Sequence, residues 1–332
     1  MLPRVRQTGF RTGAAFRLIL VLVSLGTALL PAVIPRKDSE TFSELSVQPA
    51  AQMVPPRSLS TVVYAYPSGA ERIVRTYSRT ELLSGSLMLL DDAHSLPADA
   101  PAPNTMSAAL YGKGMVPVRS LQVKSGLKTL EALIDLFRDL HARGVNGLAV
   151  WDGTVSPAEQ RARLIAHAHS LLQSQTVESA VRNTYAVLDA PGTGELLQEY
   201  GVELRFRAGT ADTPLDIPLE STREGQLLLQ TAWRYGFIRP QPDAGGRESF
   251  RFRWVGKAHA AAMTYLELSL KDYLSWLHEK GVLTIMEAGT PKYVIVCEPF
   301  AGSRTAFSLP EGAVYEASLD NMGYAVVAAT LP

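Results

Sequence analysis

Histidine and cysteine are the side chains that most often bind metals or act as activated nucleophiles, and this chain has few of them. Among its six histidines, only His167 and His169 lie close together in the sequence. On a helix, two residues that far apart point about 200° away from each other, so they do not share a face. The single cysteine, Cys297, follows the apolar run 293–296 and is expected to be a buried strand thiol. These residues predict neither a histidine metal site nor a cysteine nucleophile.

Other catalytic motifs are missing from the sequence. It has no Gly-x-Ser-x-Gly nucleophile turn, no phosphate-binding Gly-Lys-Ser/Thr loop and no Gly-x-Gly-x-x-Gly fingerprint. The stretch Pro191–Gly194 reads as a turn by composition. His259 is expected at a helix start, as a surface or capping residue.

One short segment, Glu248 to Gly256, is the most informative for function and reads Glu-Ser-Phe-Arg-Phe-Arg-Trp-Val-Gly. It resembles the segment Glu-Pro-Trp-His-x-Arg-aromatic-Val-Gly of VanY-type D-alanyl-D-alanine carboxypeptidases, in which Glu is the general base and His is a zinc ligand. The resemblance implies that Glu248 occupies the base position as a vestige. It also implies that Arg251 has replaced a zinc ligand.

The resemblance covers about residues 85 to 280. It includes a helix ending in Ala-x-x-Tyr-Gly-Phe, a closing Leu-Thr-Leu-Glu-Glu-Tyr-Leu and an entry strand with a His-Pro-Leu-Pro tail. The matching segments here are Thr222–Phe237, Leu268–Leu274, Gly85–Leu90 and His94–Pro97.

The family's other zinc ligands lie in Pro-Gly-Thr-Ser-x-His-x-x-Gly-x-x-x-Asp. Aligned from Pro191, the histidine position is Leu196; aligned back from Gly201, it is Gln198 and the aspartate position is Arg205. Neither register restores a ligand, and a mononuclear zinc peptidase needs three. Asp216 lies too far along the chain for the same register, and alone it cannot hold zinc. The resemblance therefore implies that the zinc site is lost and that no cofactor is bound.

The family's substrate-gripping Ser-Gly-Tyr-Arg-Ser is also altered, because Val155 stands at its arginine. A retained groove would be lined by polar and aromatic side chains taken from the resemblance: Glu248, Gln198, Arg205, Arg251, Tyr235 and Trp254. For Tyr235 and Trp254 the alternative is core packing, and for Glu248 it is a structural ion pair with Arg251.

The N-terminal region predicts a membrane anchor. Leu18 to Ile34 is an apolar run interrupted only by Ser24 and Thr27, which is just long enough to span a bilayer. Four arginines precede it, so the positive-inside rule places the rest of the chain outside the cytoplasm. A cleaved signal peptide is the competing interpretation. The net charge is zero for the chain and minus four without those arginines, which with the predicted location argues against nucleic acid as a partner.

Hydrophobic periodicity predicts an α+β fold, and the resemblance implies a VanY-like core with a mixed or antiparallel sheet. We expect a helix at 127–140 with Ser125 as its N-cap, a helix at 157–174 that begins after Ser156, and helices at 225–235 and 269–280. We also expect a hairpin from strands 61–66 and 72–77 and a buried strand at 145–151. The expected parts are a cytoplasmic stub and anchor (1–35), a linker (36–59), the peptidase-like domain (60–281) and a C-terminal β appendage (282–332).

These features together predict a membrane-anchored, extracytoplasmic relative of D,D-carboxypeptidases. We expect it to have lost catalysis and to recognise peptidoglycan stem peptides or to act in their regulation. Two alternatives stay open. One is an active D,D-carboxypeptidase that removes terminal D-Ala, and the other is a scaffold that binds an envelope protein through its C-terminal strands.

Overall fold

The computed structural model describes residues 59–207, 214–241 and 249–332. All of them belong to one compact unit, Leu45–Pro332. It combines helices with antiparallel sheets, so the predicted α+β class is confirmed. The apolar run 18–34 lies outside the described residues. Within them, no helix is both long enough and apolar enough to cross a bilayer.

The first sheet has five antiparallel strands in the order β1-β10-β11-β14-β13. They are β1 (Leu59–Val63), β10 (Val282–Glu287), β11 (Thr290–Pro299), β14 (Tyr324–Thr330) and β13 (Val314–Leu319). Alternation along β11 sends Ile295 and Cys297 to one face and Val294 and Val296 to the other. Both faces are therefore apolar, and both must be covered.

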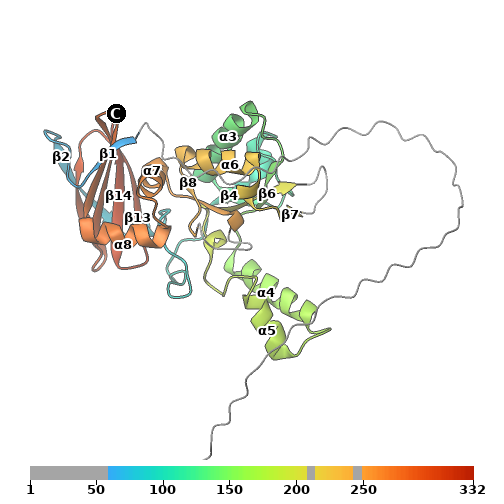
Figure 1. Cartoon of the computed structure of the whole chain (residues 1–332). Helices are drawn as coiled ribbons and strands as arrows, with labels where there is room; N and C mark the ends of the chain where they lie inside the picture. The colour runs from blue at the N-terminus through green and yellow to red at the C-terminus, as the bar shows by residue number, and fades with distance from the viewer. Residues whose placement is uncertain (1–58, 208–213, 242–248) are drawn as a thin grey trace, which may run out of the picture. The chain divides into compact units, whose positions relative to one another are not determined.

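Two layers cover these faces. Helices α7 (Lys257–Leu266) and α8 (Leu270–Lys280) pack on the first face, and Figure 1 shows α8 lying across the strands. A two-stranded ladder of β2 (Arg72–Ser78) and β12 (Arg304–Pro310) packs on the second, where Phe307 and Leu309 join the core.

The predicted hairpin between residues 61–66 and 72–77 is wrong. Strand β1 pairs with β10 and strand β2 pairs with β12. The turn after β1 lets the chain pass from one layer to the next, because β1 extends the five-stranded sheet while β2 helps to cover its face. Strands from residues 282–332 thus share their hydrogen bonds with residues 59–78.

The second sheet has the order β5-β6-β9-β8, with the short β7 paired to β6, and every pairing is antiparallel. Its strands are β5 (Leu148–Asp152), β6 (Gly201–Arg207), β9 (Arg251–Trp254), β8 (Phe237–Ile238) and β7 (Pro214–Leu215). Strand β5 confirms the buried strand predicted at 145–151.

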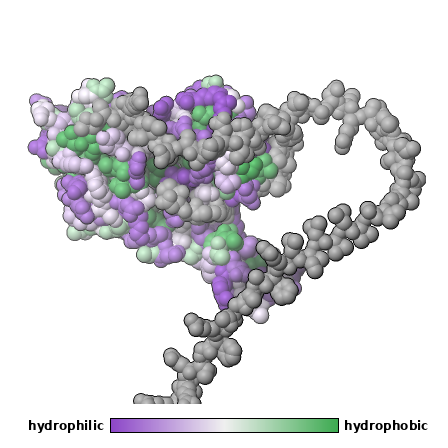
Figure 2. Space-filling model, viewed as in Figure 1, coloured by the Kyte–Doolittle hydropathy of each residue, from purple (hydrophilic) through white to green (hydrophobic). Residues whose placement is uncertain are grey.

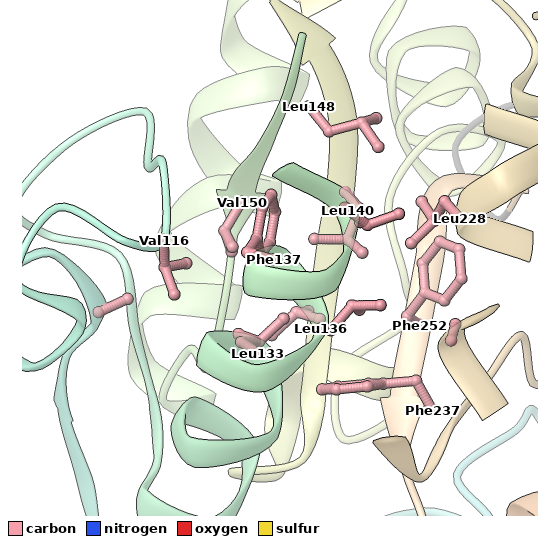
Figure 3. Close-up of a cluster of buried hydrophobic side chains, with 14 of the residues drawn as sticks. Val116, Leu133, Leu136, Phe137, Leu140, Leu148, Val150, Leu228, Phe237 and Phe252 are labelled. Atoms are coloured by element: carbon pink, nitrogen blue, oxygen red, sulfur yellow. The ribbon is translucent and has the colours of Figure 1, made fainter. Parts of the chain in front are cut away.

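One face of this sheet is apolar and carries α3 (Leu127–Ala142) and α6 (Arg223–Thr231). Figure 3 shows side chains of α3, among them Phe137 and Leu140, gathered with Val150 of β5 and Phe252 of β9. Each fully buried side chain of this size contributes about 1.5–3 kcal/mol. The packing leaves the opposite, polar face of the sheet for other contacts.

The predicted helices are confirmed, with one correction at a cap. Helix α4 (Pro157–Leu171) begins with a capping box in which Ser156 and Glu159 bond each other's backbone N–H groups. Ser125, expected to cap α3, does not, because its Oγ donates to the Glu199 carbonyl, and Gly126 is the N-cap. The remaining elements are α1 (Arg79–Leu83), α2 (Ala108–Gly112), α5 (Val177–Tyr185), β3 (Thr105–Ser107), β4 (Lys124–Gly126) and the 3₁₀ turns η1 (Glu195–Leu197), η2 (Leu219–Ser221) and η3 (Ala232–Tyr235).

The surface drawn in Figure 2 is mostly hydrophilic, with hydrophobic patches between the charged residues. Large apolar side chains that stay exposed include Val74 on β2 and Val314 on β13. Both belong to the part of the unit built from the first sheet and its covering ladder. Single exposed apolar residues are ordinary on a protein surface, so they do not by themselves mark an interface.

Candidate functional site

The polar face of the second sheet carries a row of charged side chains. On β6, Val202, Leu204 and Phe206 point into the apolar core, so Glu203 and Arg205 point to the opposite face. The same alternation on β9 places Arg251 and Arg253 there. Strand pairing then sets Glu203 opposite Arg251 and Gly201 opposite Arg253.

All three arginines of the row are buried, and carboxylates lie close to them. Arg251 is 2% exposed, and its Nη1 donates to Asp189 Oδ1 over 2.7 Å. Arg205 Nε donates to Glu203 Oε1 and its Nη1 donates to Asp216 Oδ1, each over 2.5 Å. Hydrogen bonds between ionised partners are the strong ones, and guanidinium groups offer five donors in a fixed geometry.

Arg253 is fully buried and makes the least regular contacts of the row. Its Nη2 donates to Gln198 Oε1. Its Nη1 lies 3.2 Å from Glu195 Oε2, close enough for an ion pair, but the groups are not aligned for a hydrogen bond. Burial raises the pKa of Glu195, while Arg253 and Arg251 oppose that shift. The pair is therefore held by proximity in a dry environment rather than by directed hydrogen bonds.

A small pocket opens beside Arg251. Its lining includes Val155, Arg163, Asp189 and Leu196, and its volume of about 20 Å³ is enough for little more than one water molecule. Arg163 pairs with Asp152 at the end of β5. The structure thus brings together three positions that the family resemblance had placed at one site. Val155 matches the family's substrate-binding arginine. Leu196 matches the first histidine ligand when the motif is aligned from Pro191, and Arg251 matches the histidine ligand of the segment 248–256.

Gln198, the histidine position when the motif is aligned back from Gly201, lies outside this pocket. It is buried, and its side chain accepts a hydrogen bond from Arg253 and lies 3.5 Å from Met88 Sδ. Gln198 is therefore in contact with the charged row through Arg253. Arg205 lies on the same sheet face and stacks over the Phe250 ring at 4.4 Å.

The aromatic pair expected at the groove lies on the other side of the sheet. Trp254 belongs to the apolar core, where it stacks on Tyr200 with 5.8 Å between ring centroids. Tyr235, in η3, packs against the same core. Both therefore take the core-packing alternative. Glu248 lies outside the described residues.

Five charged residues of this site were not singled out from the sequence: Glu203 and Arg253 in the row, and Arg163, Asp189 and Glu195 beside it. For Glu203 and Arg253 the signal is the two-residue alternation of charged and apolar side chains in β6 and β9, which predicts a strand with one charged face. No comparable pattern marks Arg163, Asp189 or Glu195. His259, expected at the surface, is instead 3% exposed and hydrogen-bonded to Tyr273.

The donor set does not fit zinc. Zinc in such enzymes takes nitrogen or oxygen ligands from His, Asp and Glu, and a protonated guanidinium offers no lone pair to a metal. In the described ranges, no group of three His, Cys, Asp or Glu residues is placed to hold a metal ion. Asp216, the possible displaced ligand, is mostly exposed and pairs with Arg205 instead.

Known proteins were compared with the chain in sequence and in structure. No model of a protein family matches it. Over 229 residues it is 26% identical to a D-alanyl-D-alanine carboxypeptidase of Enterococcus faecium, covering 64% of this chain and 71% of that protein. The resemblance to D-alanyl-D-alanine carboxypeptidases is confirmed.

The fold is shared with one solved structure, and a second is less similar. The vancomycin-resistance D,D-dipeptidase VanXYg, in complex with a phosphinate analogue of D-Ala-D-Ala, superposes with a TM-score of 0.62 at 20% identity, covering 79% of this chain and 100% of that one. The D,D-pentapeptidase VanY from a VanB-type resistance cassette, in complex with Zn(II), gives a TM-score of 0.44 at 21% identity over 57% of this chain and 98% of that one.

Proposed function

We propose that this protein is a membrane-anchored, extracytoplasmic relative of D,D-carboxypeptidases that binds peptidoglycan stem peptides without cleaving them. The observation that carries the proposal is the row of guanidinium and carboxylate groups on the polar sheet face. Arg205 and Arg251 stand there at positions that the family resemblance assigns to zinc ligands. The cationic charge of a metal is replaced by fixed cationic side chains.

This replacement supports binding rather than hydrolysis. A guanidinium group orients carboxylates through paired hydrogen bonds, but it does not lower the pKa of a water molecule as a bound zinc ion does. The small pocket beside Arg251 is also too narrow for a D-Ala residue. A stem peptide would then be held at the surface of this row, with no activated nucleophile beside it.

Membrane anchoring is the second part of the proposal. It rests on the apolar run 18–34 and the arginines that precede it. An exported domain tethered at the membrane would stand where stem peptides are exposed. Fusion of a reporter enzyme to either end of the chain, followed by protease treatment of intact cells, tests this orientation.

A zinc and activity measurement tests the loss of catalysis. We would purify the full-length chain from zinc-supplemented medium and measure zinc per chain by plasma mass spectrometry. We expect near-zero zinc and no release of D-Ala from a pentapeptide ending in D-Ala-D-Ala, with the Enterococcus faecium carboxypeptidase as the positive control. Isothermal titration with the same pentapeptide should show binding. Zinc near one per chain with D-Ala release would overturn the proposal in favour of an active D,D-carboxypeptidase.

A scaffold that binds an envelope protein through the C-terminal strands is the remaining alternative. Deleting the C-terminal strands is a poor test, because β10, β11 and β14 form the centre of a sheet. Val74→Asp and Val314→Asp change exposed positions only. Loss of co-purifying envelope proteins with either variant, together with unchanged stem-peptide binding, would support the scaffold.

A further inference from the structure

A second and larger pocket lies away from the charged row. It has a volume of about 200 Å³, ten times that of the pocket beside Arg251. Three segments form it: the end of α1 at Leu83 and Ser84, the loop from Leu96 to Asn104, and residues 197–200 before β6. Most of its walls are apolar, since they include leucine, proline and alanine side chains.

Glu199 is the one charged residue among the described residues that line this pocket. It is half-buried, and its Oε2 accepts a hydrogen bond from the Asn104 N–H over 2.6 Å. In the described part of the chain it has no ion-pair partner. The adjacent Tyr200 side chain also interacts with this carboxylate. A carboxylate has about four acceptor sites, so these contacts leave capacity for further donors. The pocket therefore offers negative charge in an apolar setting.

The pocket is pre-formed by contacts at both ends of its loop. Asp99 pairs with Arg79 at 2.6 Å, and Asn104 is bonded to Glu199. Pro101 and Pro103 restrict the loop backbone between these points, and Pro97 restricts it just before Asp99. Tyr200 closes the inner end, where its hydroxyl donates to the Ser84 carbonyl over 2.5 Å. A ligand would meet fixed walls, which reduces the entropy cost of binding.

We infer that this pocket binds a primary amine carried on an aliphatic chain, as in a lysine-type side chain of a peptide. The ammonium group would donate to Glu199, and the methylene groups would pack on the apolar walls formed by Leu83, Leu96 and Leu197. An anion is disfavoured by the charge of Glu199, and a purely apolar ligand would leave that carboxylate less solvated and without compensation. Within the proposed function, on which this choice of ligand rests, the amine belongs to a diamino residue of the stem peptide.

Saturation-transfer NMR on the full-length chain tests the pocket directly. The probes are Nα-acetyl-lysine methylamide and its norleucine counterpart, which has similar length and no amine. We expect the lysine probe to bind at least fivefold more tightly. In Glu199→Gln this preference should disappear, because the amide can still accept from the Asn104 N–H but carries no charge. The matched control Glu178→Gln changes an exposed carboxylate on α5 and should retain the preference.

A second variant separates binding in the pocket from binding elsewhere. Ala100→Trp places a large side chain on the pocket wall and should abolish binding of the lysine probe. Equal affinity for both probes, or a lysine preference that survives in Glu199→Gln, would overturn the inference. So would unchanged lysine binding in a folded Ala100→Trp variant.

A further titration distinguishes failure of the amine pocket from failure of the proposed stem-peptide recognition. Two pentapeptides ending in D-Ala-D-Ala, one with lysine and one with norleucine at the third residue, are titrated against the same variants. Equal binding of both, unaffected by Glu199→Gln, would retain stem-peptide recognition and reject the amine pocket. Binding of the lysine probe without binding of either pentapeptide would retain the pocket and reject stem-peptide recognition.

Discussion

The buried arginines show how charge can be stabilised inside this protein. Arg251 and Arg253 are almost inaccessible to water, and such groups are costly to bury unless carboxylates lie close to them. Asp189 and Glu195 supply that charge from the segment before β6. The buried arginines and their carboxylates therefore stabilise each other, and removing one member of a pair leaves the other without its counterion.

Arg251→Met tests this dependence. Removing one partner of a buried ion pair typically costs about 3 kcal/mol, because the remaining charge keeps its desolvation penalty. We expect a loss of that size in the free energy of unfolding from urea titrations. The control Arg138→Met breaks an exposed pair with Asp135 on α3 and should cost below about 1 kcal/mol. Equal losses in the two variants would show that the row does not stabilise the fold.

His259 predicts a sensitivity to acid. Burial lowers its pKa to about 3, against an ordinary value of 6.5, so the folded protein excludes a proton that the unfolded chain binds. The contribution to stability is complete above pH 6.5 and is lost as pH falls toward 3. The slope is at most about 1.4 kcal/mol per pH unit. His259→Gln should flatten the stability profile between pH 6 and 4, whereas the exposed control His169→Gln should leave it unchanged.

At the scale of elements, close backbone approaches set the position of the charged row. A Cβ on Gly201, the first residue of β6, would lie 2.1 Å from the carbonyl oxygen of Glu195 in η1. A Cβ on Gly153, just after β5, would meet the Lys124 carbonyl at the same distance. Glycine at these positions lets η1 and β4 lie directly against the strand ends.

Gly201→Ala therefore should disturb the polar face. Because backbone atoms block the methyl group, β6 or η1 has to shift, and we expect more than about 2 kcal/mol of destabilisation. Gly147→Ala is the control, since its Cβ would meet only the Phe206 ring at an ordinary 3.9 Å. Thermal melts of both variants give the comparison. A Gly201→Ala variant as stable as the control would indicate that the approach is not constrained.

At the scale of the whole unit, segments distant in sequence complete the same sheets. Strand β1 is an edge of the sheet formed by β10, β11, β14 and β13, and β2 pairs with β12 over the face of that sheet. Glu316 on β13 also bonds Lys128 on α3 at 3.0 Å. The C-terminal strands therefore contribute to a core that α7 and α8 share.

Truncation after Gly281 should consequently unfold more than the segment removed. Without β10, β11 and β14, the apolar faces of α7 and α8 lose their covering, and amides of α8 should lose protection from hydrogen exchange. The full-length chain provides the reference rates. A truncated chain with native protection in α8 would instead mean that residues 282–332 are an independent appendage.

The sequence by itself determined the local elements of this protein. Helical periodicity predicted α3, α4 and α8, and Ser156 predicted the start of α4, because capping and amphipathic spacing depend on neighbouring residues. The similarity to carboxypeptidases was also visible in the sequence, in short motifs such as the one that contains Arg251. Local chemistry was enough for each of these predictions.

Only the tertiary structure decided which residues meet. It paired β1 with β10 instead of with β2, moved Trp254 and Tyr235 into the core, and brought Asp189 and Glu195 to the arginines. Partners in a sheet and counterions in a core come from distant parts of the chain, and their choice depends on how apolar faces are covered. No local pattern carries that information, so the counterions of the charged row and the walls of the amine pocket could be found only in the folded molecule.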